Sequence, residues 1–185
     1  MSPMNTVPAN PHHNPRPLHL LADIGGTNCR IGVATTNGIR DARSWPTATL
    51  SNLEELLVRY SERTGFAAQS FAAGVAAPVA SGCATLTNAN FEANVNHLGI
   101  PAVLLNDLEA AAYGAAALIS RRDEQVSMLW SAVEQSPAKA RRLETLIGLG
   151  TGHGQAHIVW DGDTVHSVFP TESGHAEFAP STKEL

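Results

Sequence analysis

Two glycine-rich turns, each entered from a short apolar strand and left into another strand, constrain the fold of this chain more than any other feature. The first is Gly25-Gly26, after the strand predicted over residues 18–24, and the second lies within residues 148–154. Glycines at such turns let backbone N–H groups approach an anion closely. A dinucleotide-binding fold needs a helix after its glycine turn, so the predicted strands disfavour that fold.

The composition is that of a folded chain with no sign of a nucleic-acid or membrane partner. Hydrophobic residues make up 43% of the 185 residues, which excludes a disordered chain. Twelve basic and seventeen acidic residues give a net charge of −5, so no basic patch is available for nucleic acid. No apolar run reaches the roughly 20 residues that span a bilayer. Cys29 and Cys83 are too few for a disulfide framework, so the cytoplasm is the expected location.

Hydrophobic periodicity predicts a strand-rich first part with two helices. Strands are expected over residues 18–24, 30–36, 39–45, 71–76, 83–86 and 102–105. Asn37-Gly38 predicts a hairpin turn, because both residues tolerate positive φ. One helix is expected to begin at Ser51, with Ser51 and Glu54 as a capping box, and to end at Gly65. The second helix is expected over residues 107–118.

The C-terminal part predicts a smaller group of strands. They are expected over residues 146–149, 155–160 and 164–169, after a polar linker or crossover over residues 120–144. Asp161-Gly162-Asp163 predicts a hairpin between the last two. The chain is expected to divide into a disordered tail over residues 1–17, a small α/β lobe over residues 18–118, and the start of a second lobe over residues 119–185.

The segment from Asp23 to Asn28 is the first candidate site. Its glycines, Gly25 and Gly26, would present N–H groups to phosphate oxygens, and Thr27 and Asn28 could add side-chain hydrogen bonds. Asp23 would fit if Mg²⁺, with its waters, stood between the carboxylate and the phosphates. A side chain at Gly26 is expected to crowd the phosphates or force an unfavourable φ. The alternative is a tight hairpin whose turn is capped by a buried aspartate.

Asn106-Asp107 lies where a predicted strand ends and a predicted helix begins. Open α/β sheets present ligand-binding groups at such a place. A carboxylate here could accept the proton of a hydroxyl nucleophile. It could equally be a helix cap, and the two interpretations have the same weight on the sequence alone.

Two further segments are candidates. Gly150, Thr151 and Gly152 form the second glycine turn, which alone is a weak signal. Glu172 and His175 could grip vicinal hydroxyls of a sugar or bind a metal ion. Hydroxyl binding is preferred, because no third metal ligand lies at a suitable spacing.

Six segments together resemble, in order and spacing, the motifs of one family, the bacterial glucokinases of the sugar kinase and actin superfamily. They are residues 21–30 (LADIGGTNCR), 74–79 (GVAAPV), 86–88 (LTN), 104–110 (LLNDLEA), 150–154 (GTGHG) and 172–180 (ESGHAEFAP). The resemblance implies an α/β, ribonuclease-H-like (actin-like ATPase) fold. It also implies ATP- and Mg²⁺-dependent phosphorylation of the glucose 6-hydroxyl, a step of glycolysis.

The resemblance also implies roles for individual residues. Asp107 would be the catalytic base, and Asp23 would hold Mg²⁺ through water. The sugar would be held by Asn88, Asn106, Asp107, Glu172 and His175. The phosphates would be held by Gly25, Gly26, Thr27, Asn28, Gly150, Thr151 and Gly152. A homodimer is compatible with the full-length protein.

The chain departs from the family pattern at several places. Cys29, His153 and Ser173 stand where an alanine, a leucine and a glycine-like residue are usual. Family members also continue well beyond the equivalent of Leu185, so we expect residues 1–185 to be an N-terminal part, inactive alone and prone to associate. Two alternatives stay open: a non-catalytic sugar-binding or regulatory remnant, and a kinase for another hexose or an amino sugar.

Overall fold

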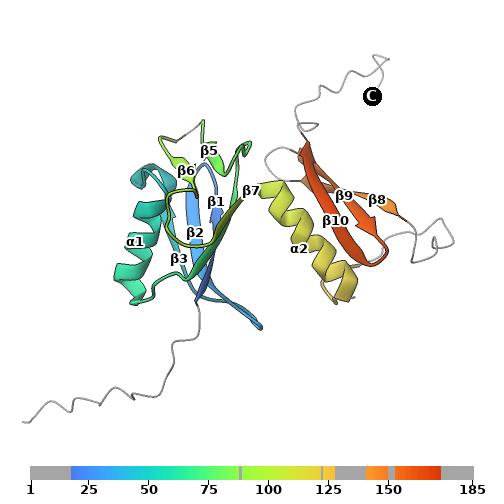
Figure 1. The fold of residues 1–185 in the computed structure, drawn as a ribbon, viewed down its shortest axis with the longest axis horizontal. Helices are drawn as coiled ribbons and strands as arrows, with labels where there is room; N and C mark the ends of the chain where they lie inside the picture. Colours follow the sequence, from blue (N-terminus) through green and yellow to red (C-terminus); the bar gives the residue numbers. More distant parts are fainter. Residues whose placement is uncertain (1–17, 88, 122, 128–140, 150–152, 172–185) are drawn as a thin grey trace, which may run out of the picture.

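Two sheets with a helix between them position the candidate site (Figure 1). The computed structural model describes residues 18–87, 89–121, 123–127, 141–149 and 153–171. Within these residues the first sheet has five strands, the second has three, and two short strands form a third sheet. The predicted tail over residues 1–17 lies outside the described part.

The five-stranded sheet combines an antiparallel and a parallel half. Its strands are β1 (His19–Ile24), β2 (Asn28–Thr35), β3 (Gly38–Pro46), β4 (Ser70–Val75) and β7 (Ala102–Asn106). Their order across the sheet is β3-β2-β1-β4-β7. Strand β1 pairs antiparallel with β2 and parallel with β4, which pairs parallel with β7. The carboxyl ends of β1, β4 and β7 therefore meet at one edge of the sheet, and Asp23 and Asn106 lie there.

The predicted strands and the first hairpin are confirmed. The turn between β2 and β3 places Gly38 at φ +117°, whereas Asn37 keeps a negative φ. The strand expected over residues 83–86 is β5 (Cys83–Thr85), and its partner β6 (Glu92–Asn94) was not predicted. With only three residues, β6 is too short to show a period-2 pattern.

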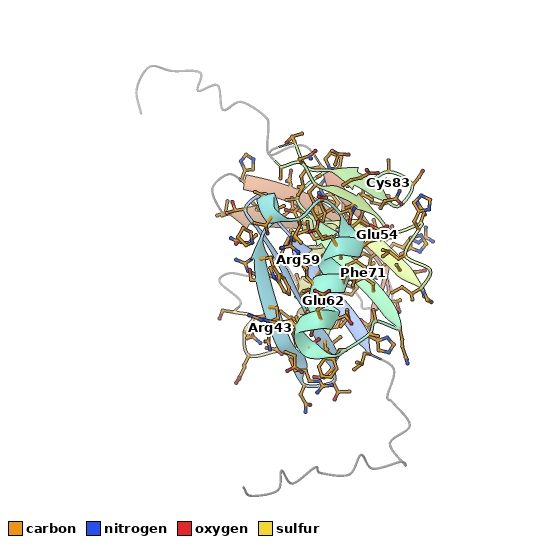
Figure 2. All side chains as sticks on the ribbon, turned by 90° about the vertical axis from the view of Figure 1, so that its left-hand side faces the viewer. Arg43, Glu54, Arg59, Glu62, Phe71 and Cys83 are labelled. Carbon is orange, nitrogen blue, oxygen red and sulfur yellow. The ribbon has the colours of Figure 1, made fainter. Side chains whose placement is uncertain are left out.

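Helix α1 (Leu53–Thr64) covers one face of the five-stranded sheet, and Figure 2 views the molecule from this side. The predicted capping box is wrong by one residue. Asn52 is the N-cap, and its Oδ1 accepts a hydrogen bond from Glu55 N at 2.9 Å. The carboxylate of Glu55, not that of Glu54, accepts from Ser51 N at 2.8 Å. Asparagine caps as well as serine does, and this frame buries Leu53 completely. The predicted end at Gly65 is confirmed, with φ +74°.

Helix α2 (Asp107–Arg121) packs on the second sheet, which is formed by β8 (Arg142–Leu149), β9 (His153–Asp161) and β10 (Thr164–Thr171). Their shared core contains Ala112, Ala116, Ala156, Ile158, Trp160 and Val168. Figure 1 shows α2 next to this sheet, and its first residues also contact β4 and β7. The helix therefore touches both sheets, and the lobe boundary near residue 118 stays a prediction.

Strand β8 starts at Arg142, so the predicted linker over residues 120–144 extends too far. The polar residues Arg142 and Glu144 at the start of β8 are typical of a linker, but both make side-chain contacts in the folded protein. Glu144 accepts hydrogen bonds from Arg142 at 3.0 Å and from Trp160 Nε1 at 2.9 Å, and the Arg142 guanidinium lies 4.2 Å from the centre of the Trp160 ring. The predicted hairpin at Gly162 is confirmed, with φ +60°. In the described part, no helix is long and apolar enough to cross a bilayer.

Candidate functional site

The first glycine turn joins β1 to β2 and is tightly closed. Gly25 N donates to Asn28 O at 3.0 Å, which completes the hairpin. A Cβ at Gly25 would lie 3.3 Å from that oxygen, whereas a Cβ at Gly26 would meet no atom within 4 Å. Neither glycine has a positive φ. The expectation that a side chain at Gly26 forces an unfavourable φ is therefore wrong, and the space beside Gly26 is open to a ligand.

Thr47 stabilises this turn through two hydrogen bonds, and the sequence analysis did not predict this role. Its side chain is fully buried, and its Oγ1 donates to Gly25 O at 2.7 Å. Its backbone N donates to Thr27 O at 2.9 Å. The thiol of Cys29 lies 3.5 Å from the same hydroxyl, and burial raises the pKa of this thiol. No local pattern marks Thr47, because its partners lie about 20 positions earlier in the chain.

Asp23 is the penultimate residue of β1, and its side chain is exposed beside the turn. Its Oδ2 accepts a hydrogen bond from Arg30 Nη1 at 2.9 Å, and the two residues are register partners of β1 and β2. The Asp23 side chain is 59% exposed. The alternative of a buried aspartate that caps the turn is therefore wrong, because Thr47 makes the stabilising contacts. Asp23 remains accessible to a hydrated cation.

The helix cap at α2 belongs mainly to Asn106. Its Oδ1 accepts from Leu108 N at 3.0 Å and from Glu109 N at 3.4 Å, and its Nδ2 donates to Ala77 O at 3.2 Å. Asp107 is the first residue of the helix, and its Oδ1 also accepts from Leu108 N, at 2.9 Å. The cap is thus present without Asp107, which removes the main structural reason for an acid at this position.

The environment of Asp107 favours its protonated form. Burial raises the pKa of its carboxyl above the ordinary value, and the negative charge of Asp23 raises it further. The hydrogen bonds from Leu108 and Asn106 offset this only in part. A carboxylate with a raised pKa is a stronger base at neutral pH, which suits proton abstraction from a hydroxyl.

Gly74 explains why α2 can begin so close to the sheet. It lies on β4 beside Asp23 in the register of β1 and β4. A Cβ at Gly74 would lie 3.1 Å from Ala110 Cβ and 3.6 Å from Asp107 Cα. The missing side chain lets the first turn of α2 rest directly on the strand, near the edge that carries Asp23.

A cavity of about 330 Å³ opens in front of Asp107, between the two sheets. One wall contains Ala77, Pro78, Asn106, Asp107, Leu108 and Glu109, and the facing wall contains His153, Gly154, Pro170 and Thr171. Helix α2 and strand β9 therefore enclose a space with carboxylates on one side and an imidazole on the other. Its volume suits a small polar ligand such as a sugar.

Several predicted site residues lie outside the described part of the chain. They are Asn88, Gly150, Thr151, Gly152, Glu172 and His175. Their neighbours in sequence bear on the cavity, because His153 follows the second glycine turn and Thr171 precedes Glu172, and both line it. No group of three His, Cys, Asp or Glu side chains suited to a metal ion occurs within the described residues.

Comparison with known proteins gives one consistent family. The chain matches the glucokinase family over residues 20–185. It is 27% identical over 172 residues to the glucokinase of Tolumonas auensis, covering 89% of this chain and 51% of that protein. It is 32% identical over 172 residues to the bifunctional protein glk of Paraburkholderia xenovorans, covering 88% of this chain and 25% of that protein. The crystal structure of a glucokinase from an Antarctic psychrotroph matches with a TM-score of 0.65 at 25% identity, covering 90% of this chain and 53% of that one.

These matches confirm the expected α/β, actin-like ATPase fold. The chain spans about half the length of the glucokinase relatives that it matches. The family match includes every predicted site residue, from Asp23 to His175. Because the matched span takes in nearly the whole chain, the chain belongs to the glucokinase family.

Proposed function

We propose that this protein transfers the γ-phosphoryl group of ATP to the 6-hydroxyl of glucose, with Asp107 as the general base. Membership of the glucokinase family supports the reaction class. The observation that carries the proposal is the position of Asp107, which lines the cavity between the sheets, has a raised pKa, and is not needed as the helix cap. A protein that only bound the sugar would have no need of a base here.

The proposed step balances through Asp107. Its carboxylate takes the proton of the sugar hydroxyl while the oxygen attacks the γ-phosphorus, and the bond to the ADP oxygen breaks. Asn106 would hold the sugar beside it. One Nδ2 hydrogen of Asn106 is used by Ala77 O, which leaves the other for a sugar hydroxyl. Asn88, Glu172 and His175 are proposed to complete the sugar site.

The first glycine turn fits phosphate groups. The space beside Gly26 is open, and Thr47 keeps the turn backbone in one conformation. We assign the backbone N–H groups of Gly26 and Thr27 and the side chains of Thr27 and Asn28 to the phosphates, with Gly25 closing the turn. Gly150, Thr151 and Gly152 are proposed to hold the phosphates from the other side.

Asp23 fits Mg²⁺ held through water. One exposed carboxylate cannot hold the ion alone, but Mg²⁺ commonly keeps several waters and takes other ligands from substrate phosphates. When bound, Mg²⁺ would neutralise phosphate charge during transfer. Arg30 would help to orient the Asp23 carboxylate, through the 2.9 Å ion pair.

The proposed reaction also bears on the cellular location, the oligomeric state and the substrate. ATP as phosphate donor and two free cysteines favour the cytoplasm, where the product would enter glycolysis. A homodimer of the full-length protein is part of the proposal. Glucose is the proposed substrate over other hexoses and amino sugars because of the family match.

A coupled ADP-release assay on the full-length protein, over a panel of hexoses and amino sugars, tests the proposal. We expect glucose-dependent ADP release that requires Mg²⁺ and is lost in Asp107→Asn. Turnover with another sugar alone would support the kinase of different specificity. Glucose binding in calorimetry without any ADP release, in wild type as in the variant, would support the sugar-binding remnant and refute the kinase.

A further inference from the structure

We propose that Leu108 is a positioning residue, which sets how closely the β9 wall of the cavity approaches Asp107 by packing against Gly148 and Gly154. The proposal rests on the proposed kinase function for its consequence, but its geometry stands on its own. Leu108 comes directly after Asp107, and both line the same cavity as Gly154.

The contact is unusually close on the glycine side. Gly148 and Gly154 are register partners on β8 and β9. A Cβ at Gly148 would lie 3.1 Å from Leu108 Cδ2. A Cβ at Gly154 would overlap Leu108 Cδ1 and would lie 3.2 Å from its Cγ. The isobutyl group of Leu108 thus occupies the space that two β-carbons would need, so these glycines let the second sheet come close to the helix.

The backbone of Leu108 is hydrogen-bonded to Asn106 and Asp107, the two residues proposed to act on the sugar. Its backbone N–H donates to Asp107 Oδ1 at 2.9 Å and to Asn106 Oδ1 at 3.0 Å. Its backbone is therefore fixed relative to the base, while its side chain is fixed relative to β8 and β9. Any shift of the Leu108 side chain must move one of these two parts against the other.

A third glycine holds the same turn of α2 from the opposite side. A Cβ at Gly74 on β4 would meet Ala110 Cβ at 3.1 Å. The first turn of α2 therefore lies between both sheets (Figure 1), and glycines contact it from each side. In such an arrangement the width of the cavity depends on side-chain volume at Leu108 and at the glycines that it contacts.

The width of the cavity matters because phosphoryl transfer depends on alignment. A misplacement of about 1 Å can lower a rate by about 100-fold. Simple core packing is the competing explanation for Leu108, since it also contacts the core shared by α2 and the second sheet. The two explanations differ in what they predict for ATP binding and turnover.

A size-exchange experiment on the full-length protein tests the proposal. Gly154→Ala should push Leu108 away and lower kcat/KM for ATP by about 100-fold. Leu108→Ala should make room for the new methyl group. The double variant should therefore recover at least about tenfold of the activity that Gly154→Ala loses. Gly114→Ala is the matched control, because Gly114 lies on the same helix and a Cβ there meets nothing within 4 Å.

The wild type and the four variants (Gly154→Ala, Leu108→Ala, the double variant and Gly114→Ala) are also measured for thermal unfolding and for the Kd of ATP by calorimetry. Recovery in the double variant of both kcat/KM and ATP affinity supports the proposal. No recovery, or a loss of Tm in Gly154→Ala with kinetics and ATP affinity like those of Gly114→Ala, overturns it. If the wild type binds ATP but phosphorylates no sugar, the proposed function fails. Loss of ATP affinity in Gly154→Ala and its recovery in the double variant would then still support positioning by Leu108. If the wild type binds no ATP, both fail.

Discussion

Replacing Asp107 by asparagine separates its proposed role in catalysis from its role in the helix. The amide Oδ1 can still accept from Leu108 N, as the carboxylate does at 2.9 Å. Asn106 continues to cap the helix through Leu108 N and Glu109 N. We therefore expect α2 to stay folded in Asp107→Asn, while the carboxylate that is proposed to take the hydroxyl proton is lost.

The expected loss in kcat is at least about 100-fold, the usual scale for a general base, or about 2.7 kcal/mol of activation free energy. Glucose affinity should fall less than that. The pKa of Asp107 is raised above its ordinary value of 3.8, mainly by burial, so wild-type kcat should fall as the pH drops through this raised pKa. The residual activity of the variant should lack this acid limb.

The contribution of Asp107 to stability should depend on pH in the opposite direction from its contribution to kcat. Because its pKa is raised, Asp107 holds its proton more tightly in the native than in the unfolded state. Its contribution to the free energy of unfolding is thus fully present below pH 3.8 and is lost as the pH rises through the raised native pKa. Asparagine carries no such proton, so the Tm of Asp107→Asn relative to wild type should increase from acid to neutral pH.

Steady-state kinetics and thermal melts across pH check both expectations. Asn106→Ala is the reference for the melts, because it removes the cap and should lose about 1 kcal/mol without the same pH dependence. A kcat within threefold of wild type in Asp107→Asn would show that Asp107 is not the base. A Tm difference that shrinks toward neutral pH would show that burial does not control this carboxyl.

Three further predictions concern the turn and the exposed sheet face. Gly26→Val should leave Tm unchanged, since a Cβ there meets nothing within 4 Å, but it should raise KM for ATP far more than KM for glucose. A lower Tm with an unchanged KM for ATP would contradict phosphate binding at this turn. Thr47→Val should lower the free energy of unfolding by about 1–3 kcal/mol and weaken ATP binding in calorimetry, because the turn carbonyl loses its 2.7 Å donor, whereas Thr47→Ser should keep ATP affinity. Residues 1–185 alone should phosphorylate no glucose. They should also self-associate in light scattering, because the apolar side chains of Ile147 and Leu149 are 58% and 84% exposed. Lysine at both positions should reduce this association, and a monomeric wild-type fragment would refute the prediction.

Much of the local structure was predictable because its causes are local. Alternating apolar residues and turn glycines predicted the hairpins, and the positive φ values of Gly38 and Gly162 confirm that glycine adopts left-handed backbone there. The order and spacing of the six motifs predicted the family, since segments that are weak signals alone form a specific pattern together. The helix caps were less predictable, because Ser51 and Asn52 are both good caps and burial of Leu53 decides between them.

The candidate site combines both kinds of information. That Asp23 and Asp107 lie near each other follows from a rule. Strand β1, which carries Asp23, and strand β7, which ends just before Asp107, run parallel on either side of β4 and end at one edge. What each residue does there did not follow. That Asn106 caps the helix while Asp107 is a half-buried acid with a raised pKa appears only when the hydrogen bonds and the burial are known.

The sequence by itself thus determined most of the elements, the order of the motifs and the membership in a family, because these depend on neighbours along the chain. Only the tertiary structure decided that Thr47 holds the first glycine turn and that Leu108 fits against Gly154. These contacts join residues about 20 and 46 positions apart, between elements that meet only after the sheets have formed. Hydrophobic periodicity says which face of an element is buried, but it does not say which atom of a distant element will lie against it.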